Sequence, residues 1–290
     1  MKWQRGYQSS DVDDNRGRRG LGGLGGAGLL GPALSIGSRF GIPGIIVALG
    51  VVFVLPRLMD ASPQALTPSQ GTAESRASND EQKQFISFVF DDAQRTWGEL
   101  LANGPRPYQK ARLVLFSDRT ASGCGSASAA VGPFYCPPDH KVYIDLSFYD
   151  ELARRFEAPG DFAQAYVIAH EVGHHVQNLL GIERAVRQAG GPREGVESNA
   201  VKLELQADCF AGIWAHSSQR RDLLEAGDID EGLAAAAAVG DDRLQKQATG
   251  AVQPETWTHG SAAQRSQWFR RGYSSGRLAE CDPFEGRLGG

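Results

Sequence analysis

The sequence contains only four cysteines among 290 residues, and no two of them form a C-x₂-C pair. Four are too few for a small scaffold held together by disulfides, and the missing pair argues against a cysteine zinc site. The sequence also has no basic excess: 30 Lys and Arg stand against 34 Asp and Glu. Nucleic-acid binding uses basic residues to neutralise phosphates, so we exclude it as the main function and expect no nucleic-acid partner.

The sixteen residues from Phe40 to Leu55 are uncharged and mostly apolar, whereas about 20 apolar residues are needed to span a bilayer. Because the side chain of Arg57 can extend to the interface, we predict one transmembrane helix over residues 40–58. A buried core helix and a cleaved signal peptide are the alternatives. Basic residues upstream of the run predict a cytoplasmic N-terminus, with the rest of the chain on the far side of the membrane.

Composition divides the chain into four parts. Residues 1–39 carry six basic and three acidic residues around a Gly/Leu tract, and we expect a disordered, basic cytoplasmic tail. Residues 40–58 are the predicted transmembrane helix. Residues 59–78 are rich in Ser, Thr, Pro and Gln and are expected to form a flexible linker. Residues 79–285 are expected to fold as one domain.

Apolar patterning in this domain favours the α+β class. A helix is predicted from Asn79, followed by a strand over 111–116 and a hairpin over 132–145 that turns at Pro137–Asp139. Together these strands predict a small antiparallel sheet. The rest reads as mainly helical, with helices near 147–157, 161–180, 194–222, 229–248 and 261–278.

The buried segment 165–180 contains the pattern H-E-x-x-H, formed by His170, Glu171 and His174. The two histidines are four residues apart, so they lie on one face of a helix and can bind one zinc ion with Glu171 beside it. The same short pattern also occurs in ordinary core helices, where the polar groups find hydrogen-bond partners. A third ligand has to decide between these two interpretations.

Thirty residues after His174, Glu204 and Asp208 are again four apart in an apolar helix. Two carboxylates on a buried face are costly unless positive charge meets them, and a zinc ion does so. We therefore predict one zinc ion per chain, bound by His170, His174 and Glu204. Asp208 is expected to accept the other ring N–H of a ligand histidine.

The pattern H-E-x-G-H followed by E-x-x-A-D resembles the gluzincin type of zinc metallopeptidase. Further pieces resemble the neutral zinc metallopeptidase family of bacterial membrane proteins. They are Lys2–Gly6, Ser10–Gly17, Cys124-Gly125, Gly132–Pro137, Val142–Asp145, His170–Gln177, Glu204–Cys209 and His259–Arg265. The resemblance implies a zincin-like, single-pass protein of the bacterial inner membrane. Its domain would be extracytoplasmic, and its substrate would be a peptide or protein.

A mechanism follows from this assignment. Zinc activates a water molecule, and Glu171 acts as general base and passes the proton to the leaving amine. His259 is a candidate for stabilising the developing oxyanion, although it could equally be an ordinary residue at a helix N-terminus. The strand over 142–145 is either a core strand or an edge that pairs with an extended peptide.

Two other functions stay open. A non-catalytic envelope module could keep zinc for its structure, and His175 would then be the suspected fourth ligand. We nevertheless expect a structural role for His175, because it lies about 100° around the helix from the ligand face. A zinc amidase acting on non-protein amides is the other alternative. The sequence does not separate peptides from other amides, and it leaves the oligomeric state unknown.

An extracytoplasmic domain would hold its cysteines as disulfides. Four cysteines permit three pairings. We favour Cys124–Cys136, which closes a local loop, and Cys209–Cys281, which fixes the C-terminal segment.

Overall fold

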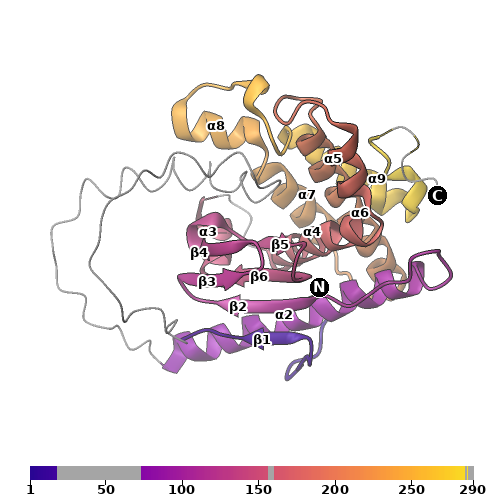
Figure 1. Ribbon diagram of the computed structural model, residues 1–290. Coiled ribbons are helices and arrows are strands. Elements are labelled where there is room, and N and C mark those ends of the chain that lie inside the picture. The colour runs from indigo at the N-terminus through magenta and orange to yellow at the C-terminus, as the bar shows by residue number, and fades with distance from the viewer. Residues whose placement is uncertain (18–72, 156–159, 285, 287–290) are drawn as a thin grey trace, which may run out of the picture.

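The computed structural model describes residues 1–17, 73–155, 160–284 and 286 (Figure 1). The predicted transmembrane helix over residues 40–58 lies outside this part, as do most of the expected tail and linker. No helix in the described part combines the length and apolar character needed to cross a membrane.

The main sheet has four strands in the order β1-β2-β6-β5. The hairpin predicted over 132–145 is confirmed, because β5 (Phe134–Cys136) pairs antiparallel with β6 (Lys141–Asp145). The other two pairs are parallel: β2 (Arg112–Phe116) with β6, and β1 (Val12–Asp14) with β2. The expected antiparallel sheet is therefore wrong, and the sheet is mixed.

The parallel pair β2–β6 results from the long excursion that joins these strands. Between them the chain forms a separate antiparallel hairpin of β3 (Arg119–Ser122) and β4 (Gly125–Ser128), then a short 3₁₀ turn over Ala129–Val131 and strand β5. β6 has neighbours on both sides, so the segment 142–145 is a core strand and not an edge.

Residues 1–17 are part of the fold, which differs from the disordered tail expected there. Met1 is buried, and the Trp3 ring packs against Phe85 with centroids 5.6 Å apart. The Tyr7 hydroxyl donates a 2.8 Å hydrogen bond to Asp91 of helix α2. Strand pairing, polar contacts and a few apolar contacts hold this segment, and these leave no apolar periodicity in the sequence that could have revealed it.

Eight helices occur in the described part: α2 (Ala73–Leu100), α3 (Ser147–Arg155), α4 (Asp161–Leu179), α5 (Ile182–Ala189), α6 (Asn199–Arg220), α7 (Asp228–Ala238), α8 (Asp241–Thr249) and α9 (Ala262–Ser275). Helix α2 begins before the expected start at Asn79, and α5 was not expected. The single helix expected over 229–248 is two helices, because the chain turns at Gly240. A Cβ there would lie 2.3 Å from the backbone nitrogen of Ala262.

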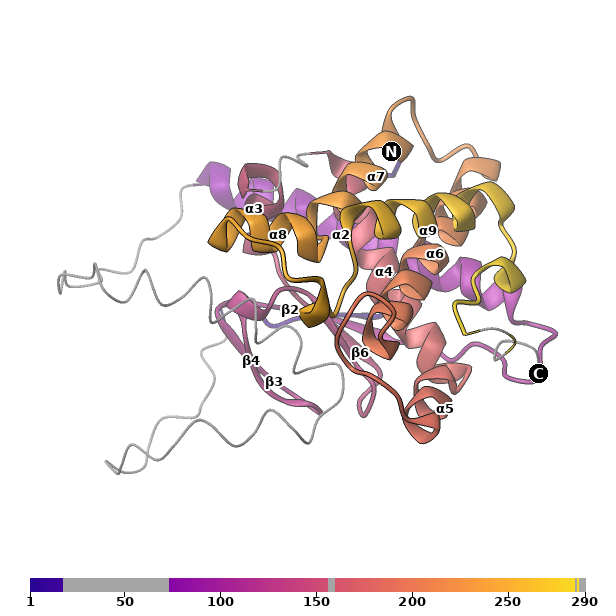
Figure 2. The same cartoon turned by 90° about the horizontal axis from the view of Figure 1, so that it is seen from above.

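Close helix crossings place the site. Figure 2 shows α6, α7 and α9 as neighbours beside α4. Helices α6 and α9 approach backbone to backbone at two glycines. A Cβ on Gly212 would lie 2.1 Å from Phe269 O, and one on Gly272 would lie 1.9 Å from Cys209 O. Helices α4 and α6 cross at Gly173, where a Cβ would lie 3.0 Å from Ala207 O.

Both favoured disulfide pairings are confirmed. Cys124 in the β3–β4 turn is bonded to Cys136 at the end of β5. Cys209 in the middle of α6 is bonded to Cys281, which follows the 3₁₀ turn Leu278–Glu280. The second bond attaches the C-terminal segment to the helix that carries Glu204.

Candidate metal centre

The H-E-x-x-H segment forms the middle of α4, and its side chains are buried. His170 and His174 lie one turn apart, with ring centroids 4.8 Å apart. Helix α6 crosses this turn and brings Glu204 opposite both rings. Its carboxylate oxygens lie 3.2 Å from His170 Nε2 and 3.4 Å from His174 Nε2. The three predicted ligands thus converge, with one donor atom of each within 4.8 Å of the others.

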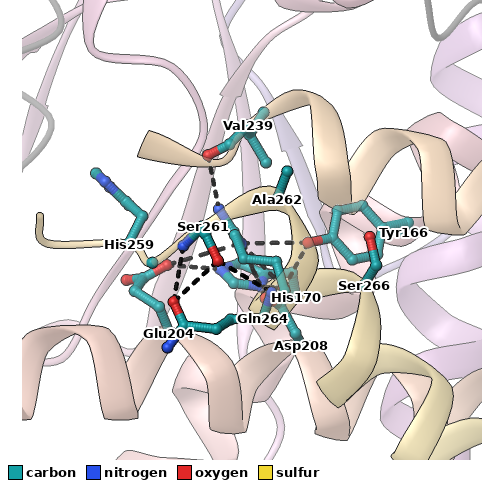
Figure 3. Close-up of polar contacts among 12 residues, drawn as sticks. Tyr166, His170, Glu204, Asp208, Val239, His259, Ser261, Ala262, Gln264 and Ser266 are labelled. Carbon is teal, nitrogen blue, oxygen red and sulfur yellow. Dashed lines mark hydrogen bonds and ion pairs between the residues drawn. The ribbon is translucent and has the colours of Figure 1, made fainter. Parts of the chain in front are cut away.

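Asp208 lies one turn beyond Glu204 and contacts His170 as predicted. Its Oδ1 is 2.8 Å from His170 Nδ1, so Nδ1–H donates to the carboxylate and Nε2 remains for a metal. The Tyr166 hydroxyl also donates to Oδ1. Figure 3 shows Tyr166, His170 and Asp208 together, with Glu204 on the adjoining turn of α6.

The positive charge that pairs with Asp208 belongs to Arg265 of α9, a residue for which the sequence predicted no role. Its Nε and Nη2 donate to the two Asp208 oxygens at 2.8 and 2.9 Å, and Nη2 lies 3.8 Å from Glu204. The guanidinium is buried, and its Nη1 donates to Val239 O. The only sequence signal was its place at the end of the segment His259–Arg265, 57 residues after Asp208.

The electrostatics of the site favour a divalent cation. Burial alone would lower the pKa of His174, but the Glu204 carboxylate raises it to about 10. Burial would likewise raise the pKa of Glu204, yet the two histidines hold it well below its ordinary value. With neutral imidazoles, the carboxylates of Glu171, Glu204 and Asp208 exceed the Arg265 guanidinium by two negative charges.

Glu171 lies between the two histidines in sequence and beside the sheet edge in space. Burial raises the pKa of its carboxyl group, against the opposing charges of His174 and His170. The backbone N–H of Tyr135, on strand β5, also opposes this rise in the pKa. Strand β5 is the edge strand of the sheet next to α4. The edge strand beside the site is therefore β5 and not the segment 142–145.

His259 lies before α9 and is held by an acid that sequence reasoning missed. Its Nδ1 is 3.0 Å from Asp241 Oδ1, and Asp241 Oδ2 accepts from the backbone N–H of His259 at 2.7 Å. His259 also contributes to the lowered pKa of Glu204. Figure 3 shows both residues on the side of the cluster opposite Tyr166. His259 is not one of the three converging ligands.

His175 does not close the site as a fourth ligand. Its Nε2 lies 2.7 Å from Gln109 O and its Nδ1 lies 2.9 Å from the Tyr135 hydroxyl, so both ring nitrogens are engaged. Burial lowers the pKa of this imidazole to about 4. Its neutral ring connects α4 to β5, as the structural interpretation predicts.

The donor set fits zinc. Two imidazoles and one carboxylate match a zinc site that keeps one position open, and both imidazoles have their Nδ1 atoms bound elsewhere. The family described as "Putative neutral zinc metallopeptidase" matches residues 1–284. The chain belongs to this family.

Two relatives match most of the chain. The "Uncharacterized protein YpfJ" of Escherichia coli (strain K12) is 44% identical over 296 residues, covering 98% of this chain and 99% of its own. The "Uncharacterized protein Rv2575" of Mycobacterium tuberculosis (strain ATCC 25618 / H37Rv) is 47% identical over 199 residues, covering 65% and 66%. No solved structure matches the chain.

Proposed function

We propose that this protein is a zinc-dependent peptidase in which Glu171 is the general base. One observation carries the proposal: the carboxylate of Glu171, buried and outside the ligand set, lies near both ligand histidines and near the backbone of Tyr135 on the edge strand β5. His170, His174 and Glu204 would hold the zinc ion. When bound, the ion would supply Lewis acidity that polarises a carbonyl and makes water easier to deprotonate.

The residues of this chain would supply the proton transfers and the binding. Glu171 would take a proton from the attacking water on its carboxylate and return it to the amine of the departing product. An extended peptide would add to strand β5 by main-chain hydrogen bonds, which brings its carbonyl next to Glu171. We therefore propose a peptide or protein substrate.

His259 would assist as a hydrogen-bonding group beside the reacting carbonyl. Asp241 binds Nδ1 and fixes the ring. In the part of the chain that the structure describes, Nε2 of His259 has no hydrogen-bond partner, so this atom is free to contact a substrate oxygen. Because Nδ1–H donates to Asp241, Nε2 would donate only in the imidazolium form, and such a donor placed at a developing oxyanion contributes to catalysis without reorganising.

The two disulfides support an extracytoplasmic location for the domain. Such bonds persist in oxidising compartments and are rare in the cytosol. We propose that the domain acts in the cell envelope and that the uncharged run near residues 40–55 attaches it to the membrane. This location would expose the sheet edge to envelope peptides and proteins.

The test is Glu171→Gln in the purified full-length protein. We expect one zinc per chain to be retained, and hydrolysis of unfolded proteins and short peptides to fall about 10²–10⁴-fold, because the amide cannot accept a proton. Glu183→Gln is the matched control, a buried carboxyl on α5 that is outside the ligand set. It should retain both zinc and activity.

Other outcomes separate the alternatives. Wild-type turnover in Glu171→Gln would exclude this residue as the base. A wild-type protein that binds zinc and cleaves muropeptides but no peptide of ordinary sequence would be an amidase for non-protein amides. Zinc binding with no hydrolysis of any amide would show a non-catalytic envelope module.

A further inference from the structure

A chain of buried hydrogen bonds runs from His174 away from the metal centre. His174 Nδ1 lies 2.8 Å from Gln177 Oε1. Gln177 Nε2 donates to Gln206 Oε1 at 3.1 Å, and Gln206 Nε2 donates to Cys281 O at 2.8 Å. Each amide therefore accepts at its oxygen and donates from its nitrogen, so the chain has one direction, from the imidazole toward Cys281.

This arrangement sets the tautomer of His174. Because Gln177 Nε2 donates to both Gln206 Oε1 and Leu203 O, its oxygen is the atom that faces the imidazole. An amide oxygen only accepts, so Nδ1 must carry the proton. In the neutral ring that metal binding requires, Nε2 then presents its lone pair on the side of Glu204 Oε1, 3.4 Å away, where a metal ion would lie.

The series of hydrogen bonds ends at Cys281, whose position is fixed by a disulfide bond. Gln177, Gln206 and Cys281 have no exposed surface, so a lost partner could not be replaced by bulk water. Cys281 follows α9 in a short segment, and its disulfide to Cys209 attaches that segment to α6, three residues beyond Gln206. The disulfide therefore keeps the carbonyl of Cys281 against Gln206.

We propose that Gln177 and Gln206 are positioning residues for the metal ligand His174, and that the Cys209–Cys281 disulfide acts on zinc affinity through them. This inference rests on the proposed zinc site. It assigns the two disulfides different tasks, because Cys124–Cys136 joins the β3–β4 turn to the end of β5 and has no contact with this chain of amides. The difference can be measured.

The experiment measures the zinc affinity of the metal-free, full-length protein by competition with a chromophoric chelator. Gln206→Met keeps the length of the side chain and removes both hydrogen bonds, and we expect zinc affinity to fall about 10–100-fold, as for other groups that orient a ligand. Cys209→Ala/Cys281→Ala should lower it in the same range. Cys124→Ala/Cys136→Ala, the matched control, should keep wild-type affinity.

Thermal unfolding of the metal-free proteins separates positioning from general stability. Both disulfide variants should lose stability, whereas only the variant lacking Cys209–Cys281 should lose affinity. Combining it with Gln206→Met should give less than the sum of the two losses, because both changes break the same chain. If Gln206→Met does not fold, Gln206→Leu, which also removes both hydrogen bonds, takes its place with the same expected direction.

Two results would overturn the inference. One is unchanged zinc affinity in a folded Gln206 variant. The other is an equal loss of affinity in the two disulfide variants. A wild-type protein that binds no zinc would instead contradict the proposed function, so the two failures are distinguishable.

Discussion

Each ligand histidine is oriented by a different kind of acceptor. His170 donates from Nδ1 to a carboxylate that also binds a buried arginine, whereas His174 donates to a neutral amide. The two imidazoles therefore present Nε2 to the same point in the same tautomer. The acceptor of His170 is charged and also binds Arg265, so removing its charge affects the arginine as well as the histidine. The neutral acceptor of His174 has no such second effect.

Asp208→Asn is expected to weaken zinc binding by about 10–100-fold, because the amide is a poorer acceptor for His170 and leaves Arg265 without a counter-charge. Competition with a chelator measures this change. Asp92→Asn is the matched control: Asp92 is also buried and binds Trp214 and Arg221, but it lies outside the site. Equal affinity loss in both variants would contradict the assigned role.

Arg265→Met is expected to destabilise the metal-free fold by about 3–5 kcal/mol, because it leaves the Asp208 carboxylate buried without its cation. Denaturant unfolding measures the change. Arg271→Met on the same helix is the control, since this half-exposed residue pairs with Glu280 at the surface and should cost about 0–1 kcal/mol. A loss for Arg265→Met no larger than that of the control would show that Asp208 does not need the arginine.

Helix α9 reaches the site only because its backbone touches α6. The crossing at Gly212 and Gly272 leaves no space for a Cβ on either helix. Arg265 lies two turns before Gly272 on α9, so the same crossing sets the distance between its guanidinium and Asp208. The glycines of this crossing thus help to position Arg265 at the candidate metal centre without contacting the centre themselves.

Gly272→Ala is therefore expected to destabilise the protein by about 1–3 kcal/mol, because its methyl group would overlap Cys209 O. Gly98→Ala in α2, where no atom lies within 4 Å of the added Cβ, should instead stabilise by about 0.5–1 kcal/mol. Chemical denaturation of both variants provides the comparison. Two losses of similar size would indicate a general intolerance of alanine and not a close crossing.

Local patterns predicted the elements whose signal is contained within a few residues. The strand 111–116, the hairpin over 132–145 and the helices carrying His170 and Glu204 all have apolar periodicity or turn residues of their own. Parallel pairing leaves no such signal, because the partners of β2 come from segments far along the chain. Arg265 was missed for the same reason: its partner Asp208 belongs to another helix.

At the scale of the whole molecule, residues 1–17 and the domain that carries the candidate metal centre form one folded unit. Strand β1 extends the main sheet, Arg112 pairs with Asp13, and the backbone N–H of Lys2 donates to Leu223 O at 2.7 Å. A strand cannot pair with a sheet across a bilayer. A cytoplasmic N-terminus with an extracytoplasmic domain would therefore require β1 to leave the sheet.

We expect residues 1–17 and the domain to lie on the same side of the membrane. Arg5→Cys and Asp222→Cys place single thiols at side chains that are 83% and 88% exposed, and the native cysteines are engaged in disulfides. A membrane-impermeant maleimide should label both variants in intact spheroplasts, or neither until permeabilisation. Labelling of one variant from outside and of the other only after permeabilisation would show that β1 leaves the sheet in the membrane-attached protein.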